Sequence, residues 1–476
     1  MPAKKKTKVV SVQKKVVKTK TKSMSKKSAT DAKNTESGDA KSQRGARAIN
    51  LLRGMKDITP KDEIYWLNIY QKAVELANAY GFGFMETPVL EEAVLFTRSI
   101  GKDTDVVEKE MYVFEDRDGT KVALRPEWTA GAARAYVTHG MQTWPQPVKV
   151  WNYGPVFRHD RPQAGRYRQF HQFGCETIGH RHPCLDAELI LVGYNFLKDL
   201  GISANVQINS IGNAEDRQNY TIELVGYLRS KRSYLCEQCK KRINKNPLRV
   251  LDCKEEHCVE VISESPQIID WLSEDSKNYF MKVLECLDEL GIPYILKSTL
   301  VRGLDYYSDT VFEYYEDAVE ERSQNALGGG GRYDFLIEQL GGVPTPSAGF
   351  AMGLERIISI LRSKEGNKNI LEKEWSRIFF AQLGEQANYR TLKLIEDLRL
   401  EGIVVRHNLA KSSLKGQMEL ADKFGATHTL ILGQKEVHDG TVIIRDMDSG
   451  NQEIVDQNKL VLEVKKLMKN IIKIRK

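Results

Sequence analysis

The chain has 476 residues, of which 41% are hydrophobic, and this length is enough for two or three domains with hydrophobic cores of their own. Its formal net charge is +7, and no apolar run approaches the roughly 18 to 20 residues of a membrane-spanning helix. The N-terminus also has no apolar stretch like that of a signal peptide, so composition excludes an integral membrane protein, and seven cysteines fit a reducing cytoplasm better than a disulfide framework.

The positive charge is concentrated in the N-terminal segment. Residues 1–50 contain 15 Lys and Arg against three acidic residues, so they carry about +12 and the remaining residues about −5. Residues 1–48 have no aromatic side chain and are predicted to be disordered. Such a lysine-rich tail keeps a protein in solution, or attracts RNA phosphates weakly and in a salt-dependent way, whereas an organellar transit peptide would be richer in arginine. The mildly acidic body must bind any polyanion through local patches.

The body begins with a predicted helix. Thr59 and Pro60 are typical of an N-cap and a first helical position, and Trp66 and Tyr70 follow at helical spacing. The stretch GFGFMETPVLE, residues 81–91, then reads as an extended segment that contains a proline. A long helix followed by a proline-bearing edge strand fits a subunit interface, and ordinary core packing explains the same pattern equally well.

The next segment, KVALRPEWTAGAARAYV from Lys121, predicts a strand followed by a helix that begins near Thr129. Glu127 lies between them, where its carboxylate can meet an ammonium group. Capping of the helix by the same carboxylate is the better explanation from position alone.

Residues 148–160 and 166–179 predict the two strands of a hairpin, because a turn rich in Pro and Gly separates them. Alternation along the second strand places these residues on one face: Arg168, Phe170, Gln172, Gly174 and Glu176. That face offers a cation, an aromatic ring, an amide and a carboxylate, which are the groups needed to hold a nucleotide and a small zwitterion together. An exposed hairpin with a solvated charged face would not need Phe170 and Gln172 in this order.

Residues 214–297 are helical and charged in composition, which indicates an inserted subdomain. It holds Cys236 and Cys239 in CEQC, then Cys253 and Cys258. These ligand types and the first spacing suit tetrahedral zinc, whereas the second pair is more widely spaced than a zinc knuckle prefers. Reduced thiols without a metal are the alternative, and we predict no metal ligand among the residues that carry the chemistry.

Three more segments carry candidate residues. In LVRGLDYYSDTVFEYY, residues 300–315, Arg302 precedes two tyrosines, and a structural ion pair is the other explanation for this arginine. Four consecutive glycines at 328–331 weaken a strand by roughly 0.5 to 1 kcal/mol each, which favours close approach to a ligand over a scaffold role. Their spacing matches neither a Walker A loop nor a dinucleotide fingerprint. In SAGFAMGLERIISIL, residues 347–361, Arg356 can project from a helix towards the sheet, or lie on its surface.

From residue 375 to 476, strand-like runs alternate with helical ones. RIFFAQL, GIVVRHN, THTLILG and GTVIIRD are separated by helices that end near Leu400 and Phe424. This alternation is typical of a compact α/β domain.

Together these segments resemble class II aminoacyl-tRNA synthetases, and specifically the histidyl-tRNA synthetase family, from about Leu51 to the C-terminal end. GFGFMETPVLEE is similar to the first class motif, FRHDRPQAGRYRQFHQFGCETIG to the second and AGFAMGLERI to the third. VRGLDYY and GGGGRYD resemble the two histidine-specific signatures. This resemblance also covers all five candidate segments.

The resemblance implies a fold and a reaction. The fold is an α+β catalytic domain over residues 49–365, an antiparallel sheet flanked by helices, followed by an α/β anticodon-binding domain over residues 375–476. The reaction is the attachment of L-histidine to tRNA(His), by way of an adenylate formed from ATP with Mg²⁺. A homodimer formed through the first motif, a cytoplasmic location and no membrane partner follow from the same resemblance.

The resemblance also implies residue roles. Arg302 would bridge the histidine carboxylate and the α-phosphate, and with Arg158 it would be catalytic. Phe170 would stack on adenine, and Arg158 and Arg356 would clamp the phosphates. The other roles are contacts to the α-ammonium (Glu127, Thr129, Gln172), to the imidazole nitrogens (Glu176, Tyr307), along the pocket wall (Tyr306, Tyr333) and to the tRNA acceptor end (Arg161, Gln163).

Two positions depart from the family pattern. Asp160 stands where the second motif usually has Glu and is one methylene shorter, which leaves its adenine contact open. Trp128 stands where the family commonly has Gly, and it either reshapes the amino-acid entrance or packs on the neighbouring helix.

Two other functions compete with this prediction. A regulatory or RNA-sensing protein on a synthetase-like scaffold would typically lack the active-site arginines or the anticodon domain, whereas Arg158, Arg302 and Arg356 and the last domain are all present. A synthetase for another amino acid is disfavoured by VRGLDYY and GGGGRYD. Because the attacking histidine carboxylate is already ionised, adenylate formation needs positioning and cations rather than a general base, in agreement with motifs that offer arginines.

Overall fold

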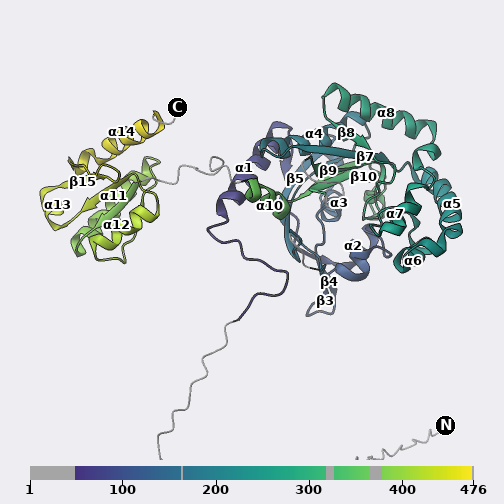
Figure 1. Cartoon of the computed structure of the whole chain (residues 1–476), viewed down its shortest axis with the longest axis horizontal. Helices are drawn as coiled ribbons and strands as arrows, with labels where there is room; N and C mark the ends of the chain where they lie inside the picture. The colour runs from purple at the N-terminus through teal and green to yellow at the C-terminus, as the bar shows by residue number, and fades with distance from the viewer. Residues whose placement is uncertain (1–48, 162–164, 318–325, 365–377, 474–476) are drawn as a thin grey trace, which may run out of the picture. The chain divides into compact units, whose positions relative to one another are not determined.

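The computed structural model describes residues 49–161, 165–317, 326–364 and 378–473, and it shows two folded parts (Figure 1). The lysine-rich tail at 1–48 and Gln163 lie outside these ranges. Within them, no helix is long and apolar enough to cross a membrane.

The first part is built on an eight-stranded sheet with the order β1-β5-β6-β11-β10-β9-β7-β8. In this order the strands are β1 (Gly83–Phe84), β5 (Val148–Phe157), β6 (Gln169–Ile178), β11 (Ser347–Gly353), β10 (Gly328–Arg332), β9 (Ser308–Glu316), β7 (Ala204–Ser210) and β8 (Tyr294–Leu296). The six central strands are antiparallel, whereas the two edge strands, β1 and β8, run parallel to their neighbours. The predicted antiparallel sheet is therefore confirmed for its centre, and the whole sheet is mixed.

A second, antiparallel sheet of three strands has the order β2-β4-β3. Its strands are β2 (Leu90–Glu92), β4 (Lys121–Leu124) and β3 (Val113–Glu115). The helix α2 (Ala93–Ser99) and the short helix η1 (Val106–Glu110) lie beside it in the chain.

Two hydrophobic cores cover the faces of the large sheet. The first packs one face against α1 (Glu63–Ala79), α4 (Pro183–Asp199), α8 (Glu274–Glu289) and α10 (Leu354–Lys364). The second lies on the other face, with these helices: α3 (Thr129–Thr138), η2 (Met141–Thr143), α5 (Ala214–Ser230), α6 (Glu237–Lys245), η4 (Pro247–Val250), α7 (Glu256–Ser263), η5 (Ile268–Trp271) and α9 (Leu336–Gln339). The short helix η3 (Arg232–Tyr234), which follows α5, has no buried residue. The helices of residues 214–297 therefore belong to two different cores. The helix α8 packs against α4 in the first core, whereas α5, α6 and α7 belong to the second.

Successive side chains of β6 point to opposite faces of the sheet, so they belong to different sides of it. Phe173 and Cys175 are fully buried in the first core, whereas Phe170 and Gln172 point to the opposite face. The hairpin of β5 and β6 is paired from Val148 with Ile178 to Phe157 with Gln169. The predicted hairpin is therefore present, with shorter strands than the sequence suggests.

One predicted element start differs from the structure, and one candidate segment lies partly before a strand. The helix α1 begins at Glu63 and not near Thr59, because Thr59 accepts a 2.8 Å bond from the Asp62 amide and its hydroxyl donates to the Asp62 carboxylate, which forms a turn. The strand β9 begins at Ser308, so Arg302 and the two tyrosines lie in the loop before it. Because these three residues lie in a loop, their side chains do not follow the alternation that a strand would impose.

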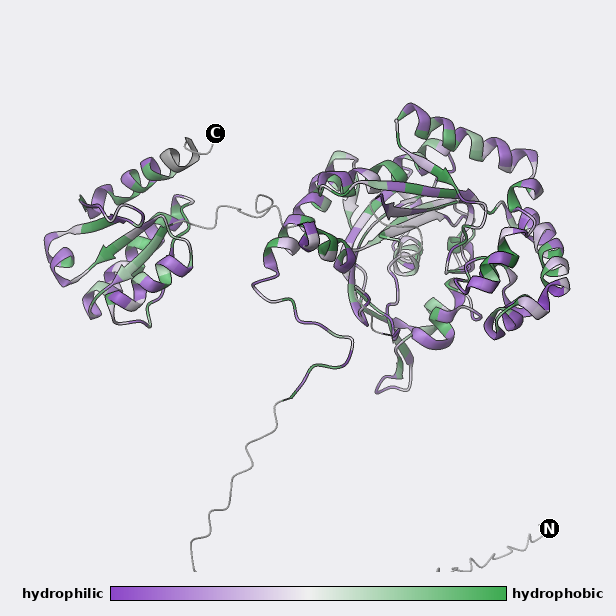
Figure 2. Ribbon diagram, in the orientation of Figure 1, coloured by the Kyte–Doolittle hydropathy of each residue, from purple (hydrophilic) through white to green (hydrophobic). Residues whose placement is uncertain are grey.

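The C-terminal part has a five-stranded sheet with the order β13-β12-β14-β15-β16. Its elements are β12 (Ile378–Gln382), α11 (Glu385–Leu400), β13 (Arg406–His407), α12 (Leu414–Lys423), β14 (His428–Leu432), α13 (Gln434–Asp439), β15 (Thr441–Asp446), β16 (Gln452–Asp456), η7 (Gln457–Lys459) and α14 (Leu460–Lys473). Figure 2 shows its central strands as mainly hydrophobic, as expected for strands covered by helices. The predicted α/β class is confirmed, and α13, β16, η7 and α14 are additional elements.

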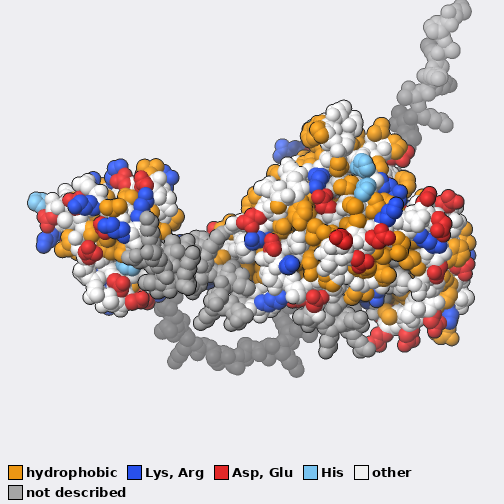
Figure 3. Space-filling model, turned by 90° about the horizontal axis from the view of Figure 1, so that it is seen from above, with side chains coloured by type: hydrophobic (Ala, Val, Ile, Leu, Met, Phe, Trp, Pro, Cys, Tyr) orange, Lys and Arg blue, Asp and Glu red, His pale blue; other side chains and the backbone are white. Residues whose placement is uncertain are grey.

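Acidic and basic side chains are interspersed on the face of both parts shown in Figure 3. This distribution agrees with a body whose net charge is small and negative, so a polyanion must find a local site.

Candidate active site

A cavity of about 440 Å³ lies on the β6 face that carries Phe170 and Gln172. Its walls come from the hairpin, the start of α3, the loop before β9, the strands β10 and β11, and α10. The predicted site residues on its lining are Glu127, Thr129, Arg158, Phe170, Gln172, Arg302, Tyr306, Tyr307 and Arg356. The fold therefore brings together residues that are up to 229 positions apart in the chain, from Glu127 to Arg356.

Glu176 and Tyr333 stand directly behind this lining. The Thr129 hydroxyl donates to one Glu176 oxygen at 2.6 Å, and the Tyr333 hydroxyl donates to the other. Burial raises the pKa of the Glu176 carboxyl to about 8, with a smaller contribution from the charge of Glu127. A side chain at Gly349 would place its Cβ 1.5 Å from Glu176 Oε2, so only glycine leaves room for the carboxylate. The result is a buried, mostly protonated carboxyl held from two sides.

Glu127 caps the helix α3. Its two oxygens accept bonds from the amides of Thr129 at 2.7 Å and Ala130 at 2.9 Å, and burial raises the pKa of the carboxyl against the effect of these bonds. The capping explanation is thus realised. Each carboxylate oxygen has a second lone pair, and the Thr129 hydroxyl oxygen can still accept, so these groups retain the capacity to bind an ammonium.

Three tyrosines pack together next to Glu176. The ring of Tyr306 lies 4.7 Å from that of Tyr307 and 5.5 Å from that of Tyr333, measured between centroids. All three are buried in the second core, and burial raises the pKa of each phenol. They form an aromatic wall whose hydroxyls are neutral donors.

Arg302 faces this wall with its guanidinium 5.5 Å from the Tyr307 ring. It forms an ion pair with Glu313, whose other oxygen accepts a 2.6 Å bond from Tyr315. Burial works against the charge of Arg302, but Glu313 together with Tyr307 and Tyr306 more than offsets this and raises the pKa of the guanidinium. The ion pair considered from the sequence is present, yet Arg302 Nε is buried with no hydrogen-bond partner among the described residues, which leaves a donor for a ligand.

The other end of the cavity is cationic. The Arg158 guanidinium donates to the Pro126 carbonyl at 2.8 Å and lies 5.6 Å from the Phe170 ring. Arg356 donates to the Ala326 carbonyl, and burial together with the nearby charge of Arg166 lowers its pKa. Cations that bond carbonyls rather than carboxylates keep their charge for an anionic ligand.

Gln172 and Trp128 also meet the cavity. Gln172 Oε1 is buried without a hydrogen-bond partner in the described part of the chain, as expected for a group that a ligand would satisfy. Trp128 is 4% exposed and packs into the second core, so the packing explanation accounts for most of its indole.

Not every residue that the sequence singles out lies at the cavity. Arg161 does not line it, and Arg168 instead donates to the Arg53 carbonyl at 3.2 Å. Asp160 does line it, in an ion pair of 3.3 Å with Arg166. Of the residues that alternation places on one face of this hairpin, Phe170 is therefore the first that lines the cavity, and Arg168 does not line it.

Only part of the glycine run approaches the cavity. Gly328 and Gly329 line it, and a Cβ on Gly329 would lie 2.6 Å from the Arg302 guanidinium. A Cβ on Gly330 would instead lie 2.0 Å from the Gly349 carbonyl. At that position the neighbouring strand, and not a ligand, excludes a side chain.

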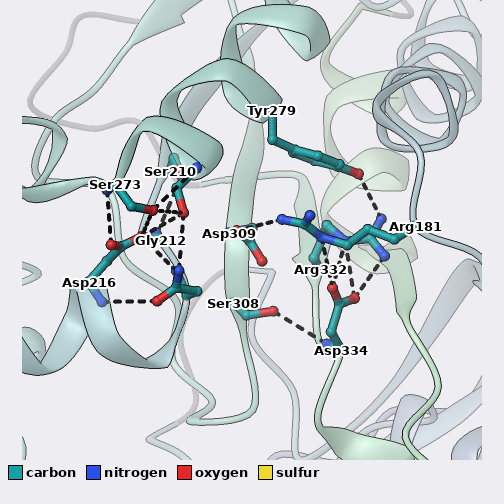
Figure 4. Close-up of polar contacts among 12 residues, drawn as sticks. Arg181, Ser210, Gly212, Asp216, Ser273, Tyr279, Ser308, Asp309, Arg332 and Asp334 are labelled. Atoms are coloured by element: carbon teal, nitrogen blue, oxygen red, sulfur yellow. Dashed lines mark hydrogen bonds and ion pairs between the residues drawn. The ribbon is translucent and has the colours of Figure 1, made fainter.

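The sequence prediction missed an ion network around Arg332, the residue before Tyr333 in the chain (Figure 4). Arg332, which is 1% exposed, bonds Asp186 at 2.6 Å and Asp334 at 2.7 Å. Arg181 joins Asp334 at 3.4 Å from the side, as Figure 4 shows. The sequence signal for this network was the pair of charged residues, Arg332 and Asp334, on either side of Tyr333 in GGGGRYD. Their ion pairs fix the backbone before and after Tyr333.

The sequence prediction also missed Arg249, which lines the cavity from η4 and pairs with Asp252 at 3.1 Å. No local pattern distinguishes this arginine from others in the inserted helices. Elsewhere in the same helices, four cysteine sulfur atoms converge: those of Cys236, Cys239, Cys253 and Cys258. They are the residues best suited to hold a metal, and they lie outside the cavity lining.

Comparisons with known proteins agree with this site. A family model described as histidyl-tRNA synthetase matches residues 54–357, and one described as an anticodon binding domain matches residues 378–467. The chain is 45% identical over 415 residues to a histidine--tRNA ligase of Dehalococcoides mccartyi strain 195, a match that covers 87% of this chain and 98% of the relative. It is 44% identical over 402 residues to a histidine--tRNA ligase of Natranaerobius thermophilus, which covers 84% and 94%.

A solved structure shows the same likeness. The crystal structure of apo S. aureus histidyl-tRNA synthetase matches with a TM-score of 0.72 at 34% identity, over 87% of this chain and 99% of that one.

Proposed function

This chain belongs to the histidyl-tRNA synthetase family, and we propose that it is the enzyme that joins L-histidine to tRNA(His) in two steps. In the first step ATP and histidine form histidyl-adenylate and release pyrophosphate. In the second step the terminal ribose of the tRNA takes the histidyl group from the adenylate.

One observation carries the assignment of the site. A single cavity has a buried carboxyl with aromatic walls behind one end and, at the other, the arginines Arg158 and Arg356, which among the described residues bond carbonyls rather than carboxylates. Histidyl-adenylate has the matching distribution, with an imidazole and an ammonium at one end and an anionic phosphate and a flat base at the other.

The histidine end is proposed to work through shared hydrogen bonds. Glu176 and Tyr307 would bond the two imidazole nitrogens, with Tyr306 and Tyr333 as walls. Glu127, Thr129 and Gln172 would accept from the α-ammonium. A site that bonds both ring nitrogens can reject analogues that lack them by about 10⁴ to 10⁵, so no editing step is needed.

The nucleotide end is proposed to stabilise charge. Phe170 would stack on adenine, while Arg158 and Arg356 would hold phosphate oxygens. Arg302, whose Nε has no hydrogen-bond partner in the described ranges, would bridge the histidine carboxylate and the α-phosphate. Since the carboxylate attacks the phosphorus in line and is ionised already, the arginines need only position the reactants and stabilise charge on the phosphate.

Magnesium is proposed as part of the ATP substrate, and no protein ligand is assigned to it. Several carboxylates on the cavity lining are engaged in ion pairs, among them Asp160 with Arg166, Asp252 with Arg249 and Glu313 with Arg302. The chain would then bind the phosphate oxygens that the metal leaves free.

The tRNA is proposed to meet both folded parts. Arg161 and Gln163, which stand between the two hairpin strands in the sequence, would reach the acceptor end, and residues 378–467 match an anticodon binding domain. The homodimer and a cytoplasmic location are proposed from family membership.

The decisive experiment is the exchange of labelled pyrophosphate into ATP, measured with each amino acid in turn and with magnesium. We expect exchange with histidine alone, followed by charging of tRNA(His). Exchange with a different amino acid would refute the histidine assignment. No exchange with any amino acid would refute the enzyme and favour a synthetase-like regulatory or RNA-sensing protein.

Two variants give the matched control for this exchange. Arg158→Lys removes the planar guanidinium from the cavity, whereas Arg168→Lys alters an arginine of the same hairpin that bonds Arg53 outside it. We expect exchange to fall in the first variant and to persist in the second.

A further inference from the structure

The four thiols of the inserted helices form the only group of three or more potential metal ligands among the described residues. Their sulfur atoms all lie within 4.8 Å of one another, and the two that are closest to solvent, on Cys236 and Cys253, are 4.0 Å apart. A tetrahedral zinc site with Zn–S bonds of about 2.3 Å has S···S edges of about 3.8 Å. The thiols therefore already stand close to the corners that a zinc ion requires.

The backbone around the cluster favours thiolates. The Cys236 amide donates to the Cys258 sulfur at 3.2 Å, and the Cys239 amide donates to the Cys236 sulfur at 3.4 Å. Bonds of this kind stabilise negative sulfur and orient metal ligands. Cys236 also caps the N-terminus of α6, whose positive end favours an anion.

The fold explains how Cys253 and Cys258 can share a site despite their wide spacing in the sequence. Cys253 lies in the loop after η4, and Cys258 lies in the first turns of α7, so the intervening residues turn the chain back to the CEQC pair. Cys239 and Cys258 are fully buried, whereas Cys236 and Cys253 are partly exposed. An ion can thus enter from one side of an otherwise closed site.

We propose that Cys236, Cys239, Cys253 and Cys258 bind one structural Zn²⁺ ion as four thiolates. All four positions of the tetrahedron are then filled by protein, which leaves no open position for catalysis. The ion is therefore separate from the ligation chemistry, and its presence can be measured independently of that activity.

Local stability explains why this part of the chain would use a metal. The three helices that carry or flank the ligands have nine, four and eight residues, and helices this short are marginal without tertiary support. Cys239 and Cys258 belong to the same buried cluster as Tyr306 and Tyr307 of the cavity wall. A zinc ion would fix the short helices to one another and to that wall.

The helix α6 connects the cluster to the cavity rim. Arg242 donates to Asp105 at 2.7 Å and to the Arg249 carbonyl at 3.3 Å, and both partners line the cavity. Asn246, just after α6, donates to Asp305 at 2.8 Å in the loop before β9. Loss of the ion should therefore loosen the rim and raise the KM for histidine, while the arginines of the nucleotide end keep their places.

The test is the metal content of the full chain, purified under reducing conditions without added chelator and measured by elemental analysis. We expect about one zinc ion per chain. Titration of the folded protein with a mercurial reagent should release that zinc as about four thiols react, and a zinc dye would report the release. Because this titration uses the unaltered protein, it does not depend on whether a variant folds.

Matched cysteine variants identify the ligands. Cys253→Ser should lose the zinc, whereas Cys286→Ser should keep it, because the Cys286 sulfur lies 3.2 Å from that of Cys184 and outside the cluster. Zinc below about one tenth of an ion per chain with all thiols free, iron in place of zinc, or full zinc retention in Cys253→Ser would each overturn the proposal.

Discussion

The hydroxyl of Tyr333 offers the sharpest test of the histidine pocket. It donates to one oxygen of Glu176, while Thr129 donates to the other at 2.6 Å. The ring is 1% exposed and packs against Tyr306, so Tyr333→Phe keeps the shape of the wall and removes a single hydrogen bond.

The size of the effect follows from the charge of Glu176. Burial raises the pKa of its carboxyl to about 8, so the group is protonated at pH 7 in the free protein. In the proposed complex one proton is shared with the imidazole, and Tyr333 then donates to a carboxylate. A hydrogen bond to a charged group contributes about 1.5 to 3 kcal/mol, and one between neutral groups about 0.5 to 1.5 kcal/mol. The difference of about 1 to 1.5 kcal/mol predicts a fall of about 5- to 13-fold in kcat/KM for histidine at pH 7.

The hydrogen bond from Tyr333 to Glu176 also affects how kcat/KM for histidine depends on pH. Free histidine loses its imidazole proton near pH 6.5, and free Glu176 loses its proton near a pKa of about 8, so kcat/KM should be highest between these values, where the pair holds one proton. Above pH 8 both partners have lost the proton and binding must take one up. The Tyr333 hydroxyl lowers the pKa of Glu176, so Tyr333→Phe should move the upper limb to higher pH by about 0.7 to 1.1 units.

The assay is pyrophosphate exchange at limiting histidine, measured from about pH 6 to 10. Tyr227→Phe is the matched control, because its hydroxyl donates at 2.8 Å to the Val261 carbonyl and does not touch the cavity. The reasoning fails if the wild-type profile has no limb near pH 8, or if Tyr333→Phe changes neither that limb nor kcat/KM for histidine.

Three further substitutions test other parts of the molecule. Gly349→Ala would place a Cβ 1.5 Å from Glu176 Oε2, so the carboxylate must move by about 2 Å, and we expect a loss of about 100-fold in kcat/KM for histidine with little change in the KM for ATP. An unchanged histidine KM in the exchange assay would contradict this. Arg302→Lys keeps a cation beside Glu313 but removes the planar fork, which should lower the single-turnover rate of adenylate formation by about 10² to 10³, and a wild-type rate would remove Arg302 from the reaction. Arg332→Met leaves the buried Asp186 carboxylate without its cation and removes one of the two arginines beside Asp334, so it should lower the free energy of unfolding by about 3 to 5 kcal/mol, and an unchanged urea midpoint would show that the network contributes no stability.

The sequence alone determined the type of chemistry and much of the fold. The hairpin follows from strand alternation, and that local period of two placed Phe170 and Gln172 on the cavity face without any knowledge of the other strands. The motifs identified the family, the arginines and the class of both folded parts. The residue types and first spacing of the cysteines indicated zinc, but left its presence open.

Tertiary structure decided the rest, because the remaining contacts join residues that no local pattern relates. The bond from Tyr333 to Glu176 spans 157 positions, and the ion pair of Arg332 with Asp186 spans 146. Arg249 reaches the cavity through inserted helices whose own periodicity reports only that they are helical. Propensity and alternation act over a few residues, whereas burial of charge, the pKa of Glu176 and the meeting of four thiols depend on which distant segments pack together.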